Sequence, residues 1–357
     1  MQSMRLNHHV RQFDAMPVRA TVDVSREEWD AYVAMRSDAS GYHAWRWRQV
    51  FERAFGHETR YIAAYRRDRV VGILPLVVFR SALFGRFMVS LPFVNYGGIV
   101  ADDEAAADAL LREAERIAAE TGVSHLELRH QRRHFAQLEV KEHKVSMVLA
   151  LPRTSDAAWT AMDRKVRNQI RKAEKSGLTA RVCGVDALPA FYKIFATNMR
   201  DLGTPVYARE FFDEVFAACG DDARVIVVSK GEQPVAAGIA LVSRSVIEVP
   251  WASSLGEFRS MCPNHILYWS IMQWSIEQGY EVLDFGRSTP DEGTFQFKRQ
   301  WGAEPRPLRW EYRLFNGARM PDHSPKNPKF KAAIEMWKRC PLWLTNTLGP
   351  RIVRSIP

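Results

Sequence analysis

One order of predicted elements occurs twice in this chain of 357 residues. The periodicity of the apolar residues predicts helix, helix, hairpin, strand, helix and strand in each half. The expected elements lie at residues 25–35, 45–55, 61–65 with 70–79, 86–92, 103–121 and 125–129, and again at 186–201, 209–219, 224–229 with 235–243, 246–252, 266–278 and 281–285. Corresponding landmarks are roughly 160 residues apart, a period too long for a solenoid. The repeat therefore predicts two similar α/β domains.

Changes of composition at the two ends complete the expected domain organisation. The parts are a flexible N-terminus over 1–20, a first domain over 21–151, a second domain over 152–320 and a tail over 321–357. The tail is basic and contains tryptophan, and Pro341 and Pro350 interrupt it. This composition is typical of an interfacial helix on an anionic membrane, or of helices packed back on the first domain. Because the prolines break one long helix, packing is the favoured interpretation.

Composition narrows the class of protein. A hydrophobic fraction of 46% and a charged fraction of 25% are those of an ordinary globular protein. No apolar run has the length of a membrane span, and the N-terminus has no secretory signal, so a cytoplasmic protein is expected, with any membrane contact at the inner face. The four cysteines are scattered, which indicates reduced thiols. The net charge of +9 favours an anionic partner.

A strongly cationic helix is predicted over residues 163–177, outside the repeat. Helical spacing places six cations around one face and three apolar residues opposite. The cations are Arg164, Lys165, Arg167, Arg171, Lys172 and Lys175, and the apolar residues are Val166, Ile170 and Ala173. Only Asp163 and Glu174 compensate this charge, and like charges at helical spacing destabilise a helix. We therefore expect an anionic ligand here, with a solvated surface as the alternative.

The segment 280–302 predicts a second feature of interest, a strand end followed by a turn-rich loop. The loop is expected to present Lys298 beside Phe297 and Trp301. A cation among aromatic residues after a strand suits a binding or reaction site in an α/β fold. The alternative is a surface loop with a solvated lysine.

Four motifs in order give a resemblance to a known family. The series IRKAEKSG, NMRDLGTPVYAREFF, GYEVLDFGRS and FQFKRQWGAEP resembles the FemAB-like branch of the GNAT-fold acyltransferases over about residues 150–305, and PFVNYGGI extends it weakly into the first half. Within that branch the chain is most similar to members associated with exosortase and exopolysaccharide gene clusters of Gram-negative bacteria. The resemblance implies two tandem GNAT-like domains, each a mixed, mostly antiparallel sheet flanked by helices.

The resemblance also implies an activity and its residues. The activity is transfer of an acyl or aminoacyl group to an amine of a cell-envelope or exopolysaccharide precursor, with an amide product. Phe297 and Lys298 match the FKxxFG-type motif of the transfer centre, where a fixed cation stabilises the oxyanion. The substrate-binding set is Arg167, Arg171 and Lys172 from the cationic helix, with Tyr207, Tyr96 and Arg287. Apart from the resemblance, the residue types make Asp284 and Glu304 candidates for a general base, with the capping of a neighbouring backbone group as an equal alternative for Asp284.

The acyl donor stays open between coenzyme A and aminoacyl-tRNA. Simple GNAT enzymes bind the coenzyme A pyrophosphate on a glycine-rich turn. The corresponding stretch 259–264, RSMCPN, has no glycine, and Pro263 removes an amide donor. The Fem factors carry a coiled-coil arm thought to help with aminoacyl-tRNA, and no sustained heptad repeat occurs here.

Other functions remain as alternatives. The first is an acetyl-CoA-dependent N-acetyltransferase, and the second is a non-catalytic module that contacts a membrane through the tail or binds nucleic acid. Nucleic acid other than a tRNA donor is disfavoured because no aromatic residue interrupts the cations of 164–175. No metal is expected, since His130 and His134, the best-spaced pair, flank two arginines.

Overall fold

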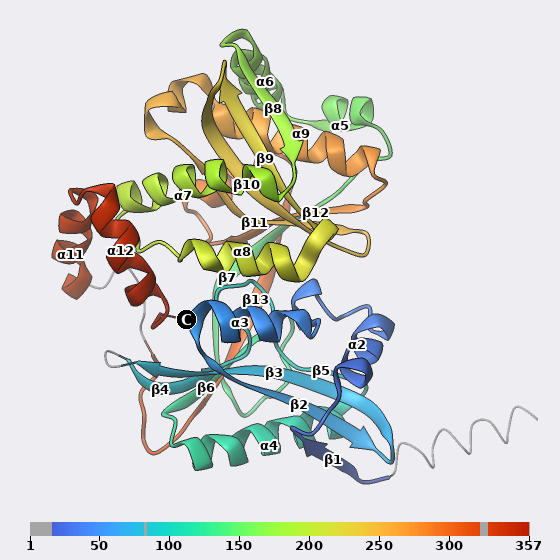
Figure 1. The fold of residues 1–357 in the computed structure, drawn as a ribbon. Coiled ribbons are helices and arrows are strands. Elements are labelled where there is room, and N and C mark those ends of the chain that lie inside the picture. Colours follow the sequence, from blue (N-terminus) through green and yellow to red (C-terminus); the bar gives the residue numbers. More distant parts are fainter. Residues whose placement is uncertain (1–15, 82–83, 322–327, 357) are drawn as a thin grey trace, which may run out of the picture. The chain divides into compact units, whose positions relative to one another are not determined.

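The computed structural model describes residues 16–81, 84–321 and 328–356, and these residues form two compact units. The first unit comprises Met1–Glu52, Gly56–Lys141 and Arg309–Met320, and the second comprises Arg53–Phe55, Glu142–Leu308 and Pro321–Pro357. Figure 1 shows the elements of each unit.

The first unit is a mixed sheet with helices on both faces. Its strands follow the order β1-β2-β3-β4-β6-β13, and β5 pairs with β3. In Figure 1, α4 covers one face of this sheet, and α2 and α3 lie on the other. The elements are β1 (Val18–Thr21), α2 (Arg26–Met35), a 3-10 turn (Gly41–His43), α3 (Arg46–Phe55), β2 (Glu58–Arg66), β3 (Arg69–Ser81), β4 (Gly85–Val89), β5 (Val100–Ala101), α4 (Glu104–Thr121), β6 (His125–His130) and β13 (Glu304–Leu314).

The second unit repeats this architecture with added elements. Its strands follow the order β7-β12-β11-β10-β9-β8. In Figure 1, α7 and α8 lie on one face and α5, α6 and α9 on the other. The elements are β7 (Glu139–Ala150), α5 (Ser155–Ala161), α6 (Arg164–Lys175), β8 (Leu178–Cys183), α7 (Leu188–Leu202), α8 (Arg209–Cys219), β9 (Ala223–Lys230), β10 (Gln233–Ser243), β11 (Val246–Ser254), α9 (Pro263–Glu277), β12 (Val282–Ser288), α10 (Gly293–Arg299), α11 (Pro328–Lys338) and α12 (Leu342–Val353), with 3-10 turns at Val185–Ala187, Gly220–Asp222 and Gly256–Met261.

The predicted repeat is confirmed by these two strand orders. In each unit two helices precede an antiparallel hairpin, β2–β3 or β9–β10, and a strand, a helix and a last strand follow. The last two strands are parallel in both units, as β4 with β6 and as β11 with β12, and the other described pairings are antiparallel. The expected fold class, tandem units that are each built on mixed, mostly antiparallel strands flanked by helices, is therefore confirmed.

The chain exchanges a strand between the units, so its division differs from the expected one. Strand β7 follows β6 in sequence but pairs with β12 of the second unit. Strand β13 follows the second unit but, over Arg309–Leu314, pairs with β6 of the first unit. The expected boundary at residue 151 assigns β7 to the first domain, whereas most of β7 belongs to the second unit, because tertiary hydrogen bonding and not sequence adjacency decides which unit a strand joins.

Both ends of the chain also differ from expectation. Residues 1–15 of the expected flexible N-terminus lie outside the described residues, whereas Val18–Thr21 is a strand paired with β2. The tail was expected to pack on the first domain, but α11 and α12 pack on α7 of the second unit. Pro341 does separate these two helices, while Pro350 lies inside the last turn of α12. Among the described residues, no helix is long and apolar enough to cross a membrane.

Gly98 provides a test of how closely the first unit is packed around His130. A Cβ atom added to Gly98 would lie 1.9 Å from Cδ2 of His130. The imidazole cannot retreat easily, because its Nδ1 is hydrogen-bonded to the buried carboxylate of Glu311. We expect Gly98→Ala to lower the free energy of unfolding by about 2 kcal/mol or more, measured by urea denaturation. Gly256→Ala is the control, since no atom lies within 4 Å of its added Cβ; equal stability of the two variants would contradict this packing.

Candidate functional site

The candidate site lies where the parallel pairing of β11 and β12 ends. These strands pair only from Val246 with Val282 to Glu248 with Asp284, although both continue beyond that point. Past this point β12 keeps its antiparallel partner β7, in which Ser146 lies opposite Arg287. The following residues of β12 therefore need other hydrogen-bond partners on the side that faces away from β7.

A bulge at Gly286 shapes this strand end. Gly286 has φ 75°, a left-handed conformation that a residue with a side chain adopts only with strain, and the pairing with β7 shifts register between Asp284 and Arg287. Oδ1 of the buried Asp284 accepts hydrogen bonds from the backbone N–H of Gly286, at 2.8 Å, and from the Ser146 hydroxyl, at 2.7 Å. Asp284 thus caps the bulge, the structural role considered alongside general base catalysis.

The side chain of Lys298 supplies hydrogen-bond donors for the carbonyl groups at the end of β12. It does not lie on a loop, as expected, but on the short helix α10, and only 8% of it is exposed. Its Nζ donates hydrogen bonds to the carbonyl oxygens of Gly286 and Arg287, each at 3.0 Å. The bulge brings two successive carbonyls within reach of one ammonium group. A protonated Nζ has three N–H bonds, and these two carbonyls engage two of them.

Opposing effects of burial and of neighbouring charges set the pKa of Lys298. Its pKa is lowered to about 8, chiefly because the group is buried; the carboxylates of Asp284 and Glu248 act to raise the pKa, and the Arg287 guanidinium acts to lower it. Glu248 and Asp284 are buried neighbours on β11 and β12. At neutral pH the side chain is therefore mostly an ammonium group, held in a site with little water. An ammonium in such a site interacts with a developing negative charge more strongly than one in water.

Aromatic residues surround the Phe297 side of α10. The ring of Phe297 lies 5.2 Å from that of His265, 5.5 Å from that of Tyr268 and 6.2 Å from that of Trp301, measured between centroids. His265 is half-buried, and burial together with the charge of Lys165 lowers its pKa to about 4. The imidazole is therefore neutral at physiological pH. Because Lys165 belongs to α6, this histidine connects the cationic helix with the aromatic residues around α10.

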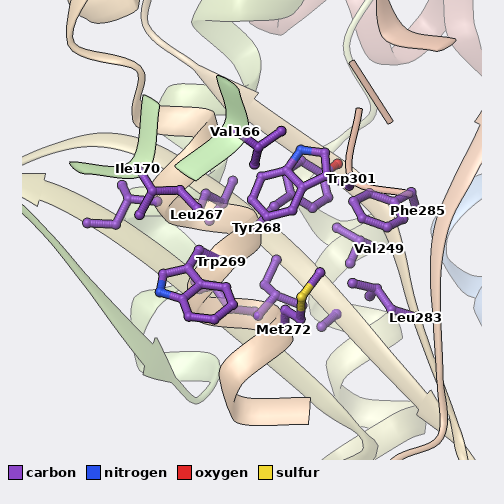
Figure 2. Close-up of a cluster of buried hydrophobic side chains, with 14 of the residues drawn as sticks. Val166, Ile170, Val249, Leu267, Tyr268, Trp269, Met272, Leu283, Phe285 and Trp301 are labelled. Atoms are coloured by element: carbon purple, nitrogen blue, oxygen red, sulfur yellow. The ribbon is translucent and has the colours of Figure 1, made fainter. Parts of the chain in front are cut away.

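The cationic helix is confirmed as α6, capped by Asp163, whose carboxylate accepts from the backbone N–H of Lys165 at 2.6 Å. Val166, Ile170 and Ala173 are buried in the core of the second unit. Figure 2 shows Val166 and Ile170 in one cluster with Leu267 and Tyr268 of α9 and with Trp301 and Phe285. The core that holds α6 is thus the same core that holds α10.

The exposed side of α6 carries uncompensated charge. Arg171 and Lys172 are exposed and Arg167 is half-buried. Within the part of the chain that the structure describes, none of the six cations of α6 forms an ion pair. This observation favours an external anion over a network of internal salt bridges.

Trp159 is a neighbour of these cations that sequence reasoning missed. It lies on α5, where Nη1 of Arg167 reaches its carbonyl oxygen at 3.5 Å and the Arg171 guanidinium lies 5.2 Å from its ring centroid. The position of Trp159 orients both arginines by cation–π and backbone contacts. Helix α5 was not predicted because its seven residues span only two turns.

The remaining expected site residues lie elsewhere. The ring of Tyr207 packs among Phe195, Phe211 and Phe212, and its carbonyl accepts from the Tyr192 hydroxyl. Tyr96 is buried in the first unit beside Tyr42, so it belongs to a different unit from the other candidates. Glu304 is exposed at the start of β13. The structure therefore brings together Lys298, Phe297, Asp284 and Arg287, and the substrate-binding roles of Tyr207 and Tyr96 stay predictions.

The start of α9 corresponds to the turn on which simple GNAT enzymes bind the coenzyme A pyrophosphate. Pro263 occupies the first turn, as the sequence indicated, and Cys262 before it takes the left-handed conformation, φ 60°, that a glycine would adopt more easily. The Cys262 thiol donates to Oε1 of Gln169 on α6, at 2.6 Å. Among the described residues, no group of three or more histidine, cysteine, aspartate or glutamate side chains is placed to hold a metal ion.

Comparisons with known proteins indicate a GNAT-type fold. A family model described as an acetyltransferase (GNAT) domain matches residues 161–299. No curated protein matches the chain in sequence. Solved structures that resemble it include FemX, with TM-score 0.63, 16% identity and coverage of 82% of this chain and 96% of that one.

Two further structures resemble the chain over most of its length. One is the C-terminal domain of a putative lysylphosphatidylglycerol synthetase from Agrobacterium fabrum, with TM-score 0.55, 15% identity and coverage of 82% and 92%. The other is a tandem GNAT protein from the clavulanic acid biosynthesis pathway, with TM-score 0.52, 10% identity and coverage of 85% and 99%. At these identities the likeness is one of fold.

The lowered pKa of Lys298 predicts how stability depends on pH. Between about pH 8 and 10 the unfolded chain binds a proton at this group and the folded chain does not. The free energy of unfolding of the wild type should therefore rise relative to that of Lys298→Met, by up to about 1.4 kcal/mol per pH unit. Urea denaturation of both proteins across this range measures the difference. Parallel pH curves would mean that the Lys298 pKa is not lowered by folding.

Proposed function

We propose that this chain, which contains a GNAT acetyltransferase domain and resembles the FemAB-like acyltransferases, forms amides by transfer of an acyl or aminoacyl group to the amine of an anionic precursor. The observation that carries this proposal is the buried ammonium of Lys298 at the end of β12, with two N–H bonds engaged by backbone carbonyls. Such a group is fixed in position before substrate binds. A fixed donor stabilises a transition state without reorganisation, and loss of one donor of this kind typically costs a factor of 10²–10³ in turnover.

The proposed reaction is direct attack within a ternary complex. The lone pair of the acceptor amine forms the new C–N bond, and the carbonyl π electrons move to oxygen, where the third N–H of Lys298 stabilises the negative charge. The tetrahedral intermediate then expels the thiolate or alkoxide of the donor, and the proton lost by the amine leaves with that group. Binding both substrates side by side supplies much of the acceleration.

Asp284 and Arg287 support Lys298 in this proposal. The carboxylate of Asp284 holds the Gly286 bulge and favours the charged form of Lys298, so a positioning role fits its hydrogen bonds better than general base catalysis. Arg287 lies on the same strand end and lowers the Lys298 pKa. Its positive charge suits a carboxylate or phosphate of the substrate.

The cations of α6 are proposed to hold the anionic part of the donor or acceptor. Arg171 and Arg167 are oriented by Trp159, and Lys172 is exposed beside them. A phosphate or uronic carboxylate fits this chemistry, because arginine binds both in a bidentate manner. The envelope or exopolysaccharide precursor and the association with exosortase clusters rest on the family resemblance, and the cytoplasmic location rests on the composition of the sequence.

The acyl donor has two candidates. An aminoacyl donor is supported by the similarity in fold to FemX and to a putative lysylphosphatidylglycerol synthetase. The second candidate, an acetyl-CoA-dependent N-acetyltransferase, is supported by the acetyltransferase family match. Pro263 and the absence of the glycine-rich turn weigh against coenzyme A at α9, although Cys262 adopts the backbone conformation of a glycine there.

The first experiment tests the reaction and its donor together. Purified protein is incubated with amine acceptors and either acetyl-CoA or aminoacyl-tRNA, and amide products are identified by mass spectrometry. We expect product with one donor class, and we expect Lys298→Met to lower turnover at least about 100-fold. Methionine has nearly the same side-chain volume as lysine. Circular dichroism shows whether the variant is folded. A folded Lys298→Met protein with wild-type turnover would remove Lys298 from the transfer centre.

A second experiment tests the role of α6. Arg171→Glu reverses an exposed charge without touching the core, so the protein should fold normally. We expect the KM for the anionic substrate to rise about ten-fold or more at low salt, with a smaller effect at high salt. Lys193→Glu is the matched control, since Lys193 is exposed on α7 of the same unit. Equal KM values for the two variants would assign the α6 cations to the solvated surface.

A further inference from the structure

The hydrogen bonds of Lys298 also fix the direction of its lone pair when the amine is neutral. A neutral amine carries two N–H bonds and one lone pair, arranged tetrahedrally around nitrogen together with the bond to carbon. The carbonyl oxygens of Gly286 and Arg287, each 3.0 Å from Nζ, accept both N–H bonds. The lone pair therefore points in the remaining direction, the one that the third N–H bond takes in the ammonium form.

The neutral form of Lys298 is populated near physiological pH. Burial lowers the pKa of this group to about 8; Asp284 and Glu248 act to raise the pKa, and Arg287 acts to lower it. About a tenth of such side chains are neutral at pH 7, compared with about one in 2,500 for a solvated lysine with a pKa of about 10.4. Burial of this kind makes a lysine nucleophilic. One position thus presents an N–H donor when it is charged and a nucleophile when it is neutral.

We propose that Lys298 is itself acylated by the acyl donor when no acceptor amine is bound, and that this modification inactivates the protein. This self-acylation rests on the proposed function, since the donor carbonyl group must bind beside Nζ. The Nζ lone pair forms a C–N bond to the carbonyl carbon of the donor thioester or ester, and the C–S or C–O bond breaks. One of the two Nζ protons leaves with the thiolate or alkoxide, so the reaction needs no further reactant.

Acylation removes both features of Lys298 on which the proposed transfer depends. The amide product carries no charge, so it stabilises an oxyanion less than the ammonium group does. It keeps one N–H bond, so one of the carbonyl groups of Gly286 and Arg287 loses its partner. A bound acceptor amine prevents this outcome, because it takes the acyl group first.

Competitive acetylation tests the nucleophile without any need for a donor site. The full-length protein and Nα-acetyl-lysine amide are treated together with limiting N-acetoxysuccinimide, and mass spectrometry measures acetylation of the peptide that contains Lys298. The rate for Lys298 relative to the model amine should fall about 60-fold from pH 7 to pH 10, because the neutral fraction of Lys298 saturates while that of an amine with a pKa of about 10.4 keeps rising. No acetylation of Lys298, or a ratio that does not change with pH, would overturn the proposal.

Incubation with the donor alone tests the inactivation. The donor is acetyl-CoA or aminoacyl-tRNA, whichever gives an amide product with an acceptor. Without acceptor, we expect one acyl group per chain, on Lys298, and a proportional loss of turnover; acceptor at about ten times its Kd should slow acylation about ten-fold. Amide product without any acylation of Lys298 would rule out self-acylation and leave the proposed function standing. Absence of product with either donor would contradict the proposed function, and self-acylation with it.

Two variants serve as controls for the position of the acyl group. Lys193→Met removes an exposed lysine of α7 in the same unit, so this variant should be acylated and lose turnover as the wild type does. Lys298→Met has no nucleophile at the candidate site and should gain no acyl group. Acylation of Lys298→Met to the same extent as the wild type would place the modification elsewhere and contradict the inference.

Discussion

Two hydrogen bonds from the Lys298 ammonium to the carbonyl oxygens of Gly286 and Arg287 hold the candidate site together. They occur where the parallel pairing of β11 and β12 has ended and the carbonyls of β12 would otherwise be buried without partners. Burying an ammonium group is costly, and the carboxylates of Asp284 and Glu248 offset part of that cost. Because these bonds attach α10 to β12, they also set the position of Phe297 in its aromatic surroundings.

Helix α6 complements this buried cation with exposed ones. Its apolar side shares a core with α9 and α10, so the cations are carried by a well-packed element and not by a mobile loop. Trp159 further limits the freedom of Arg167 and Arg171. A charged surface that is rigid before binding loses less entropy when an anion binds than a flexible one does.

The two units share one feature of chain topology, the exchange of a strand. Each unit contains a strand taken from the segment of chain that follows the other unit, β7 in the second and β13 in the first. In the second unit β7 contributes Ser146, which hydrogen-bonds Asp284 at the candidate site. A residue that lies in the first half of the sequence thus supports the strand end that Lys298 completes.

The local features of this protein followed from its sequence. The repeated order of elements, the apolar stripe of α6 and the pairing of Phe297 with Lys298 are visible because helix and strand periodicities and short motifs are properties of neighbouring residues. Other features depend on hydrogen bonds and contacts between distant segments. The exchange of β7 and β13, the burial of Lys298 on a helix and the contact of Trp159 with Arg171 are of this kind, and no pattern of adjacent residues encodes them. Tertiary structure alone decided these, because a strand joins the sheet that satisfies its backbone groups wherever that sheet lies in the chain.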